Sequence, residues 1–333
     1  MKVRLIYFLY YIKELDFRKF NRFLNYASKS SGKSKINLLG DSIRSVFKYN
    51  ISLLDYFYFR FFSKDNSERS QWVGTGYMYE FQLKMNPKDT REVLSNKIKF
   101  LNHFAPFIRR CYYDIQTLKS NRRIIEELLA NESGKVVIKD SKGQIGAEVE
   151  IIRCIDHTPD SLINYIGRKD YDLIEEFVVQ HPDLMELSPS GLNTVRIITQ
   201  MNGDHIDFIA GRLRISVNSP VDNMAAGNLA APIDLRTGTV SGPGVYSDIT
   251  KPEQSIHPAT GKPIIGFIIP FWNEVIDLAM KAAFHTPENK SVGWDIAITP
   301  EGPELIEGNH NWCKLLWQLP VNQGLKDQLE KYL

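Results

Sequence analysis

The sequence predicts a mixed α+β fold, largely antiparallel in its strands and preceded by a helical N-terminal segment. Helical periodicity dominates as far as residue 130. From Lys135 onward, short β-branched runs alternate with Gly, Pro and Asn, as expected for strands joined by turns. With 333 residues, of which 43% are hydrophobic, the chain is long enough for about two domains with a buried core.

The helical elements follow from apolar spacing and from residues that favour helix ends. Residues 1–70 are expected to be mainly helical, with a polar break at residues 28–35. The run from Asp89 to Glu92 has the composition of a helix start. Further helices are expected at residues 122–130, 161–167, 271–284 and 323–333.

The strands are short runs of apolar and β-branched residues between turn formers. They are expected at residues 136–138, 148–152, 173–179, 194–199, 206–209 and 212–217. The last two strands, residues 292–299 and 304–309, are joined by a turn rich in Pro and Gly. Helices followed by short strands of this kind indicate an α+β body.

Composition excludes several classes of protein. The three cysteines, Cys111, Cys154 and Cys313, are widely spaced and odd in number, which fits neither a disulfide framework nor a zinc cluster. No run approaches the roughly 20 apolar residues of a membrane span. Residues 5–12 are apolar but lack a small-residue cleavage site after them, so no signal peptide is expected. These observations predict a cytoplasmic protein.

Charge is distributed unevenly along the chain. Residues 1–64 hold 13 Lys or Arg against 4 Asp or Glu, a balance of +9, and the remainder carries −7. Aromatic residues from Tyr7 to Phe62 are interleaved with these basic residues. The pattern fits a helical layer with buried aromatics, or a basic face that binds anionic lipid or an anionic substrate. No nucleic-acid partner is expected, because no recognition motif accompanies the charge.

The closing hairpin carries three oxygen-bearing side chains, with Asp295 on its first strand and Glu307 and Asn309 on its second. Residues two apart share one face of a strand, and the turn brings Asp295 opposite the other pair. Hard oxygen ligands of this kind suit Mg²⁺. The alternative is a polar hairpin tip. Against it, neighbours such as Ile296 and Leu305 indicate buried strands, where an unpaired carboxylate is costly unless it holds a metal.

A second hairpin, with glycines in its loop, is expected at residues 135–150. A P-loop or a Rossmann fingerprint would place a helix after the glycines, whereas here strands flank the loop on both sides. The glycines let backbone N–H groups approach phosphates, and Lys139, at the end of its strand, can contact phosphate oxygens. An ordinary glycine hairpin is the alternative.

Two weaker patterns follow along the chain. The strand at residues 173–179 carries Glu175-Glu176 next to an aromatic residue. It fits an edge strand with solvated carboxylates, or a hinge that meets a purine edge and its amine. The loop at residues 220–232 is rich in small residues, which would let a ligand approach its backbone, and a plain surface loop is the alternative.

Three arginines lie on consecutive strands: Arg196 on one, and Arg212 and Arg214 on one face of the next. Buried arginines need anionic partners. Phosphate, a carboxylate substrate, or Asp295 and Glu307 would serve. A structural salt-bridge ladder is the alternative.

Together, these motifs resemble the ATP-grasp superfamily in their order and spacing, over about residues 90–315. They are a lysine ahead of the body, the glycine hairpin with its lysine, the Glu-Glu hinge, the strand arginines and Asp-x11-Glu-x-Asn. Residues 193–199, 221–233 and 292–312 more closely resemble the branch called sugar-transfer-associated ATP-grasp proteins, related to α-L-glutamate ligases. The resemblance implies two α+β lobes gripping ATP, at residues 89–180 and 181–333, after a helical segment at residues 1–88.

The resemblance implies a nucleotide site in the first lobe. Lys97 would be the first nucleotide lysine, with Lys99 as the other candidate, and Lys139 would be the second. The loop over the phosphates would consist of Ser141, Gly143 and Gly146. Adenine would be held by Glu175, Glu176 and the backbone of Val178. His181 or Asp183 would lie near the ribose, where the sequence departs from the usual acidic residue.

The resemblance also implies a metal and substrate site. Asp295 and Glu307 would bind two Mg²⁺ ions, with Glu307 bridging them and Asn309 completing the second site. Arg212 would stabilise the transferring phosphoryl group, so its removal should cost on the order of 10²–10³ in rate. Arg196 or Arg214 would hold an anionic substrate. Loop contacts to substrate would come from Asn223, Gly227 and Asn228.

The implied activity is that of an ATP-dependent carboxylate–amine ligase. ATP would phosphorylate a carboxylate, and an amine would displace phosphate from the acyl phosphate to form an amide. The branch suggests an amino acid and a sugar acid such as a uronic acid, joined in capsule or surface-polysaccharide biosynthesis. Residues 1–64 would then contact an anionic membrane or a lipid-linked glycan at the inner membrane face. The alternatives are a kinase on the same fold, acting on a small molecule or saccharide, and a non-catalytic ATP-binding module of a glycan-assembly complex.

Overall fold

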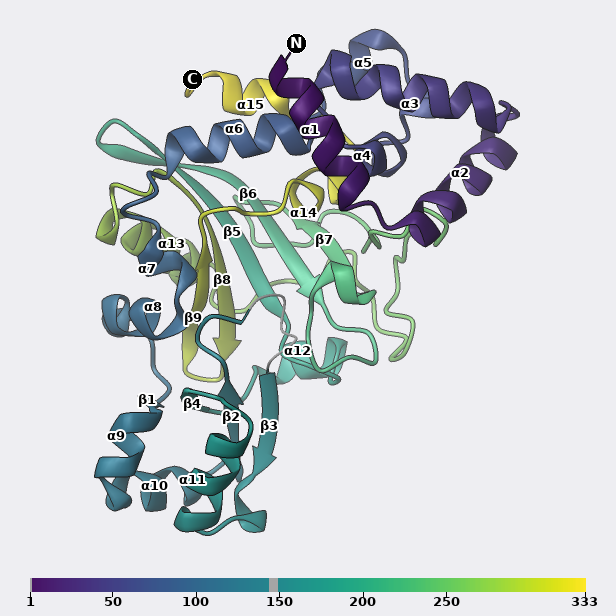
Figure 1. The fold of residues 1–333 in the computed structure, drawn as a ribbon. Coiled ribbons are helices and arrows are strands. Elements are labelled where there is room, and N and C mark those ends of the chain that lie inside the picture. Colours follow the sequence, from purple (N-terminus) through teal and green to yellow (C-terminus); the bar gives the residue numbers. More distant parts are fainter. Residues whose placement is uncertain (1, 144–148) are drawn as a thin grey trace.

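The computed structural model describes residues 2–143 and 149–333 (Figure 1). A bundle of N-terminal helices is followed by a small sheet with its own helices and then by a larger sheet (Figure 1). All described strand pairs in both sheets are antiparallel. The expected α+β class is therefore confirmed, whereas the division at residues 88 and 180 stays a prediction.

The N-terminal bundle consists of short helices with side-chain caps. Its helices are α1 (Lys2–Lys13), α2 (Phe17–Ser31), α3 (Lys35–Tyr49), α4 (Leu53–Tyr58) and α5 (Asn66–Ser70). Asp16 and Ser34 accept backbone N–H groups at the starts of α2 and α3, and Gly32 ends α2 with a left-handed φ of 69°. The predicted polar break is thus the short link between these two helices.

Aromatic side chains form the core of this bundle. The fully or nearly fully buried members include Phe20, Phe23, Tyr56, Phe57 and Phe61. For these residues the helical-layer interpretation of the basic, aromatic segment is correct. The helix α1 differs, because most of its apolar side chains are exposed.

The small sheet has the strand order β1-β4-β2-β3. Its strands are β1 (Tyr112–Asp114), β2 (Lys135–Lys139), β3 (Val149–Arg153) and β4 (Leu173–Glu176). The helices α9 (Ile115–Ser120), α10 (Arg122–Leu129) and α11 (Pro159–Arg168) belong to this part of the chain. Apolar residues of β2, β4, α10 and α11 share one core, so this sheet and its helices pack as a unit.

The large sheet has the strand order β7-β6-β5-β8-β9. Its strands are β5 (Thr194–Asn202), β6 (His205–Ile215), β7 (Leu229–Ile233), β8 (Ser291–Thr299) and β9 (Gly302–Asn309). The helix α13 (Trp272–His285) packs on one face, against residues such as Val195 and Trp294.

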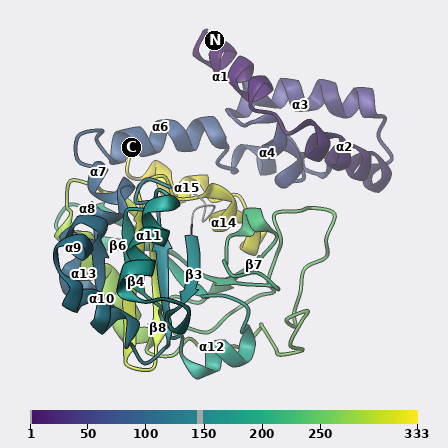
Figure 2. The same ribbon diagram turned by 60° about the horizontal axis from the view of Figure 1, so that its bottom comes forward.

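One helix from the first third of the sequence and two from its end cover one end of the other face of this sheet. They are α6 (Thr75–Met85), α14 (Lys314–Gln318) and α15 (Lys326–Glu330). Their side chains share a core with Ile198 of β5 and Ala210 of β6. Figure 2 shows α6 running beside α15, with α1 to α4 beyond its far end. The rest of this sheet face remains free of these helices and carries polar side chains. The short helices α7 (Glu92–Ser95) and α8 (Lys97–His103) lie between α6 and β1 along the chain. The helix α12 (Pro182–Leu187) lies between β4 of the small sheet and β5 of the large one.

Several predicted boundaries were wrong for identifiable reasons. The strands predicted at residues 206–209 and 212–217 are one strand, β6, which continues through Gly211 and ends at Ile215. A Cβ at Gly211 would lie 3.2 Å from Leu235 and 3.4 Å from Trp272, so the close packing of these side chains favours a glycine within the strand. The strand predicted at residues 173–179 ends at Glu176.

Two strands were missed. The strand β7 overlaps the end of the predicted loop at residues 220–232. Pro232 and its small neighbours resemble a loop, yet an edge strand tolerates proline. The three-residue strand β1 lies in a region predicted as helical, and it is too short to show a period. Among the described residues, no helix combines the length and apolar character needed to cross a membrane.

Candidate functional site

A row of polar side chains crosses the free part of the large sheet. In the strand register Arg212 is opposite Arg196, Arg196 is opposite Asp295, and Asp295 is opposite Glu307. Directly opposite residues of antiparallel strands point to the same face. The prediction that the closing hairpin brings Asp295 opposite Glu307 is therefore confirmed, and this face also carries Arg214.

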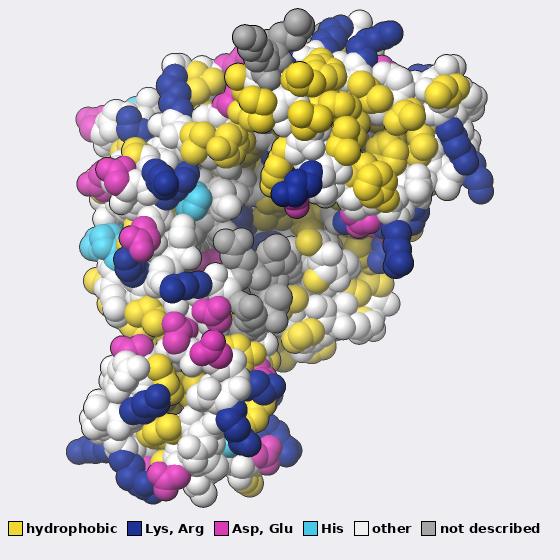
Figure 3. All heavy atoms as spheres, in the orientation of Figure 1, with side chains coloured by type: hydrophobic (Ala, Val, Ile, Leu, Met, Phe, Trp, Pro, Cys, Tyr) yellow, Lys and Arg dark blue, Asp and Glu magenta, His cyan; other side chains and the backbone are white. Residues whose placement is uncertain are grey.

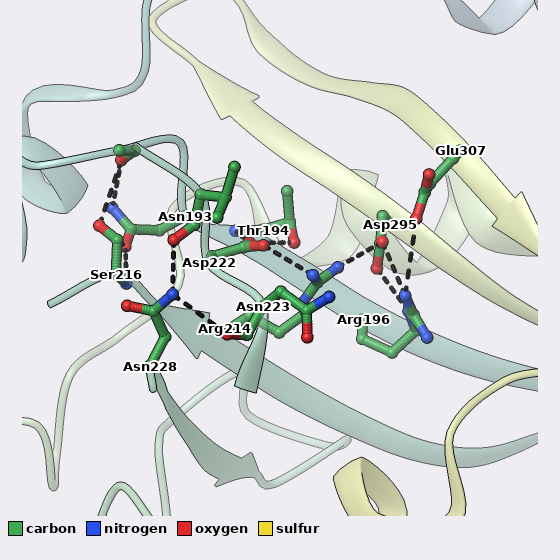
Figure 4. A network of polar contacts seen from close by, with 12 residues as sticks. Asn193, Thr194, Arg196, Arg214, Ser216, Asp222, Asn223, Asn228, Asp295 and Glu307 are labelled. Atoms are coloured by element: carbon green, nitrogen blue, oxygen red, sulfur yellow. Dashed lines mark hydrogen bonds and ion pairs between the residues drawn. The ribbon is translucent and has the colours of Figure 1, made fainter. Parts of the chain in front are cut away.

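Asp295 is the centre of a buried charge network (Figure 4). It is 1% exposed. Arg196 binds it through two nitrogens, with Nη2 at 2.7 Å from Oδ2, and Arg214 Nη1 donates to the same oxygen. Burial alone would raise the pKa of Asp295, but the two guanidinium groups lower it, so this carboxylate is ionised. The salt-bridge ladder considered for the strand arginines is present.

Glu307 lies at the edge of this network and has a looser ion pair than Asp295. Its side chain is 47% exposed, and Arg196 Nη2 is 4.0 Å away. Asn309 Nδ2 donates to Glu307 Oε1 at 3.1 Å. Partial burial and the charge of Asp295 raise the pKa of Glu307. An added cation would relieve this repulsion.

These residues fit Mg²⁺ by their chemistry. Two carboxylates and an amide on neighbouring strands offer oxygen atoms to one face, and Mg²⁺ needs few protein ligands because water and phosphate fill its other positions. No group of three His, Cys, Asp or Glu side chains with metal-binding geometry occurs in the described part of the chain. The candidate set therefore depends on the Asn309 oxygen.

Arg212 differs from the other two arginines. Its side chain is buried, Nε donates to Trp317 O at 3.2 Å, and Nη1 donates to Gly211 O at 2.7 Å. Burial lowers the pKa of Arg212 to about 10. The structure thus directs Arg212 towards the backbone carbonyls of Trp317 on α14 and Gly211 on β6, and brings Arg196 and Arg214 to Asp295.

Two lysines from different elements meet next to this face. Lys139, at the end of β2, pairs with Glu175 Oε1 at 2.6 Å. Lys97, at the start of α8, donates through Nζ to Asp140 O at 2.8 Å and also to Gly143 O. Burial and the charge of Lys139 lower the pKa of Lys97, while the charge of Glu307 opposes this. Two ammonium groups close to the carboxylates on this face of the large sheet are suited to binding a polyphosphate.

The two lysines considered for the first position lie in different surroundings, and only Lys97 of these two contacts the loop after β2. Lys99 forms an exposed pair with Glu92 at 2.6 Å, outside the group that includes Lys139. In the loop after β2, the N–H and hydroxyl of Ser141 both donate to Asp172 at 2.6 Å, so this side chain shapes the loop. Gly146 lies outside the described residues.

The predicted hinge has two carboxylates in different settings. Glu175 is 3% exposed and lies between Lys139 and Arg110. Although burial opposes it, the charges of Arg110 and Lys139 lower the pKa of Glu175 to about 2. Glu176 accepts the N–H of Cys111 at 2.7 Å.

The segment after the hinge leads into the large sheet. Beyond Val178, the N–H of His181 donates to Ile298 O at 2.7 Å, which fixes this segment to β8. The ring of His181 accepts the N–H of Asp183 at 3.2 Å and caps α12, while the Asp183 side chain is 61% exposed. His181 therefore acts here as a helix cap.

Arg110 is a buried residue that the sequence did not reveal. Its Nε donates to Glu175 Oε2 at 2.6 Å and its Nη1 to Glu304 Oε2 at 3.1 Å. It joins β4 of the small sheet to β9 of the large one. Its Nη2 is buried without a hydrogen-bond partner among the described residues. No sequence signal could have found it, because its partners lie 65 and 194 residues away.

Asp222 is a second residue that the sequence did not reveal. It accepts the N–H of Thr194 at 2.8 Å and pairs with Arg214 Nη2 at 2.7 Å (Figure 4). Arg214 therefore joins Asp222, on the loop before β7, to Asp295 on β8. Asn193-Thr194 and Asp222 belong to stretches that carry the family resemblance, which was the available signal.

The three loop residues expected to contact substrate also hold the loop in its shape, and their contact with substrate stays a prediction. Asn228 is 1% exposed, with Nδ2 donating to Val221 O at 2.6 Å and Oδ1 accepting the N–H of Val217 at 2.8 Å. Asn223 Oδ1 accepts the N–H of Ala225 at 2.9 Å. Gly227 has φ 92°, a left-handed conformation that favours glycine. The loop backbone and the exposed turn remain open to a ligand.

Comparison with known proteins identifies the family. Residues 77–332 match the family described as sugar-transfer-associated ATP-grasp. The match covers most of the chain, so the protein belongs to this family, and the resemblance inferred from its motifs is confirmed. No curated protein matches the chain.

Solved structures with a similar fold are distant in sequence. N5-carboxyaminoimidazole ribonucleotide synthetase purK in its ADP complex has 13% identity and a TM-score of 0.40, covering 66% of this chain and 45% of that one. D-alanyl-alanine synthetase A from Vibrio cholerae has 10% identity and a TM-score of 0.40, covering 72% of this chain and 60% of that one. The ATP-grasp ligase PsnB, complexed with a precursor variant, Mg and ADP, has 14% identity and a TM-score of 0.42, covering 74% of this chain and 59% of that one. The chain thus spans 45–60% of the length of these three structures.

Proposed function

We propose that this protein is an ATP-dependent ligase that forms an amide through an acyl-phosphate intermediate. The observation that carries the proposal is that Lys97 lies within reach of the charges of both Lys139 and Glu307, while Lys139 pairs with Glu175. Phosphoryl transfer needs mainly positioning and neutralisation of charge. These groups supply both without a Ser–His or Cys–His nucleophile. Membership of the ATP-grasp family supports the same class of enzyme.

In this proposal the nucleotide lies between the two sheets. Lys97 and Lys139 bind its phosphates, beneath the loop that contains Gly143. Adenine contacts Glu175, Glu176 and the backbone of Val178. The two ion pairs of Glu175 hold its side chain in one position, so it is preorganised for contact with adenine.

Asp295, Glu307 and Asn309 would hold two Mg²⁺ ions. Bound there, Mg²⁺ would neutralise the charge that develops on the transferring phosphoryl group. Asp295 is held ionised by its arginines, and the Glu307 carboxylate, 4.0 Å from Arg196 and 47% exposed, is the more accessible of the two to a metal ion.

We assign the anionic substrate to Arg196 and Arg214, since both point to the free face of the sheet. Arg212 was the expected partner of the phosphoryl group, and its bonds to Trp317 and Gly211 favour a structural role instead. Replacement of Arg214 should therefore lower the rate on the order of 10²–10³-fold. Replacement of Arg212 should lower it less.

The substrates we propose are an amino acid and a uronic-acid-type saccharide, joined in capsule or surface-polysaccharide biosynthesis. The family name supports a link to sugar transfer. The basic region at residues 1–64 suits an anionic or lipid-linked saccharide near the inner membrane face, in a protein otherwise in the cytoplasm.

The test measures product release with a panel of amino acids and uronic acids. A ligase releases ADP and phosphate only when carboxylate and amine are both present, and hydroxylamine traps its acyl phosphate as a hydroxamate. Lys139→Met should abolish turnover. Lys142→Met, on the exposed part of the same loop, should retain it. ADP release together with a stable phosphorylated product would instead identify a kinase, and ATP binding without turnover across the panel would identify a binding module.

A further inference from the structure

The helix α1 presents an unusual surface. Five of its apolar side chains are more than half exposed: Val3 54%, Leu5 51%, Ile6 64%, Leu9 59% and Tyr10 58%. Other helices of the bundle bury their large aromatic residues in a common core. Isolated exposed apolar residues are ordinary, but a contiguous group on one helix marks a contact surface.

The exposed side of α1 is distinct from the side that holds it to the protein. Phe8 packs against Phe47 of α3 with ring centroids 5.3 Å apart, and Tyr7 packs edge-on against Tyr79 of α6 at 6.1 Å. Tyr11 is buried in the bundle core. The helix is therefore docked by one side, and its apolar outer side is free.

The surface extends beyond α1. Tyr79 and Leu83 of the neighbouring α6 are 53% and 43% exposed. Figure 3 shows apolar side chains gathered over the N-terminal helices, at the top of the molecule. We name the group Val3, Leu5, Ile6, Leu9, Tyr10 and Tyr79 the α1 patch.

Charge decides what covers the α1 patch. Helix α1 contains no Asp or Glu, and its charged residues are Lys2, Arg4 and Lys13. Residues 1–64 carry +9 in total. A second copy would bring two such positive regions together, whereas an anionic bilayer is attracted to them. A helix of 12 residues is too short for the roughly 20 needed to span a membrane, so it would lie in the interface.

We propose that the α1 patch is a membrane-contact surface, which inserts its apolar side chains into the headgroup region of an anionic bilayer while the surrounding lysines and arginines bind lipid phosphates. The inference deepens the membrane contact proposed above for residues 1–64 and rests on that part of the proposed function, not on the ligase chemistry. It gives the protein a defined side that faces the bilayer.

The test measures sedimentation of the full chain with vesicles of phosphatidylcholine alone and of phosphatidylcholine with phosphatidylglycerol. The wild type should bind only the anionic vesicles, and binding should weaken with added salt. The triple variant Leu5→Ser, Ile6→Ser, Leu9→Ser should lose at least about tenfold in affinity, because three apolar side chains would no longer enter the bilayer. Since these residues are exposed, the melting temperature should not change.

A matched control changes exposed isoleucines elsewhere: Ile256→Ser, Ile265→Ser, Ile268→Ser. This variant should bind vesicles as the wild type does. Equal binding by the α1 triple variant, or none by the wild type, would overturn the proposal. A concentration-dependent dimer lost in the α1 triple variant would do so as well, by assigning the surface to a second copy. ATP binding, measured on the same variants, should be unchanged, which separates this outcome from failure of the ligase proposal.

Discussion

At the scale of single residues, the two carboxylates at the centre of the site are opposite in register but unequal in surroundings. Asp295 is bound by two arginines, whereas Glu307 has its nearest guanidinium nitrogen 4.0 Å away. The raised pKa of Glu307 means that its ionised form is disfavoured in the folded protein. Such a group reduces stability as the pH rises through its folded pKa. Function and stability therefore oppose each other at this position.

We predict that Glu307→Gln raises the melting temperature of the metal-free protein at neutral pH and weakens Mg²⁺ binding at least tenfold. Calorimetry in EDTA and titration with Mn²⁺ in the presence of ADP measure the two effects. Protons compete with metal at Glu307, so the metal affinity of the wild type should fall as the pH is lowered. Because the pKa of Glu307 is raised, this fall should begin above the ordinary carboxyl pKa of 4.5. Asn309→Asp serves as a comparison, since it adds a charge nearby and should lower stability without metal. A variant that is both less stable and equally able to bind metal would contradict the assignment.

Asp222 is a positioning residue by its geometry, because it reaches the site only through Arg214. We predict that Asp222→Asn raises the KM for the carboxylate substrate while ADP binding stays unchanged. Stability should fall by about 1–3 kcal/mol, since Arg214 keeps Asp295 as one partner and loses the other. Asp204→Asn, a change of a fully exposed aspartate in the turn between β5 and β6, is the control. A purely structural role would lower the melting temperature and leave KM unaltered.

At the scale of elements, the two sheets are joined by one guanidinium group. Arg110 holds Glu175 of β4 and Glu304 of β9, and all three side chains are at most 4% exposed. Removing one member of a buried ion network leaves the others uncompensated. We predict that Arg110→Leu lowers the free energy of unfolding by about 3–5 kcal/mol. Arg109→Leu, at the exposed neighbouring position, should have little effect.

The pH dependence of stability tests the same network. The pKa of Glu175 is lowered from 4.5 to about 2, so its ionised form stabilises the fold above pH 4.5, and this contribution is lost as the pH falls towards 2. Arg110→Leu should make the free energy of unfolding depend less on pH between 2 and 4.5, because Glu175 loses one of its two cations. Urea unfolding between pH 2 and 6 measures the effect. An equally steep dependence on pH in the variant would show that other carboxylates control acid unfolding.

Elements with a regular period could be predicted from the sequence, and those decided by tertiary contacts could not. The hairpins β2–β3 and β8–β9 follow from alternation around glycine or proline turns, and they place Lys139, Asp295 and Glu307. The strand β6 was divided because the packing of Trp272 on Gly211 has no local signature. Arg110 was missed for the same reason, since its two partners are remote in sequence.

At the scale of the whole molecule, the N-terminal bundle is fixed to the end of the chain. Asp55 accepts the N–H groups of Ser52 and Thr75 and pairs with Lys314 Nζ at 3.1 Å. The side chain of Gln318 bonds both the N–H and the carbonyl of Val73, at 2.9 and 3.0 Å. Since α14 also receives the bonds of Arg212, the bundle, the C-terminal helices and the sheet are joined through one short helix. A bundle that contacts a membrane would thereby orient the site.

We predict that Lys314→Met loosens this connection without affecting the nucleotide site. The Asp55 carboxylate is 1% exposed, so the loss of its cation should cost about 3–5 kcal/mol and should increase cleavage between α4 and α6 in limited proteolysis. ADP binding by the variant should match the wild type at temperatures below its melting transition. Lys281→Met, which removes an exposed pair with Asp277 on α13, is the matched control and should cost at most about 1 kcal/mol. If the two variants show the same proteolysis pattern, the Asp55–Lys314 pair does not hold the bundle to the C-terminal helices.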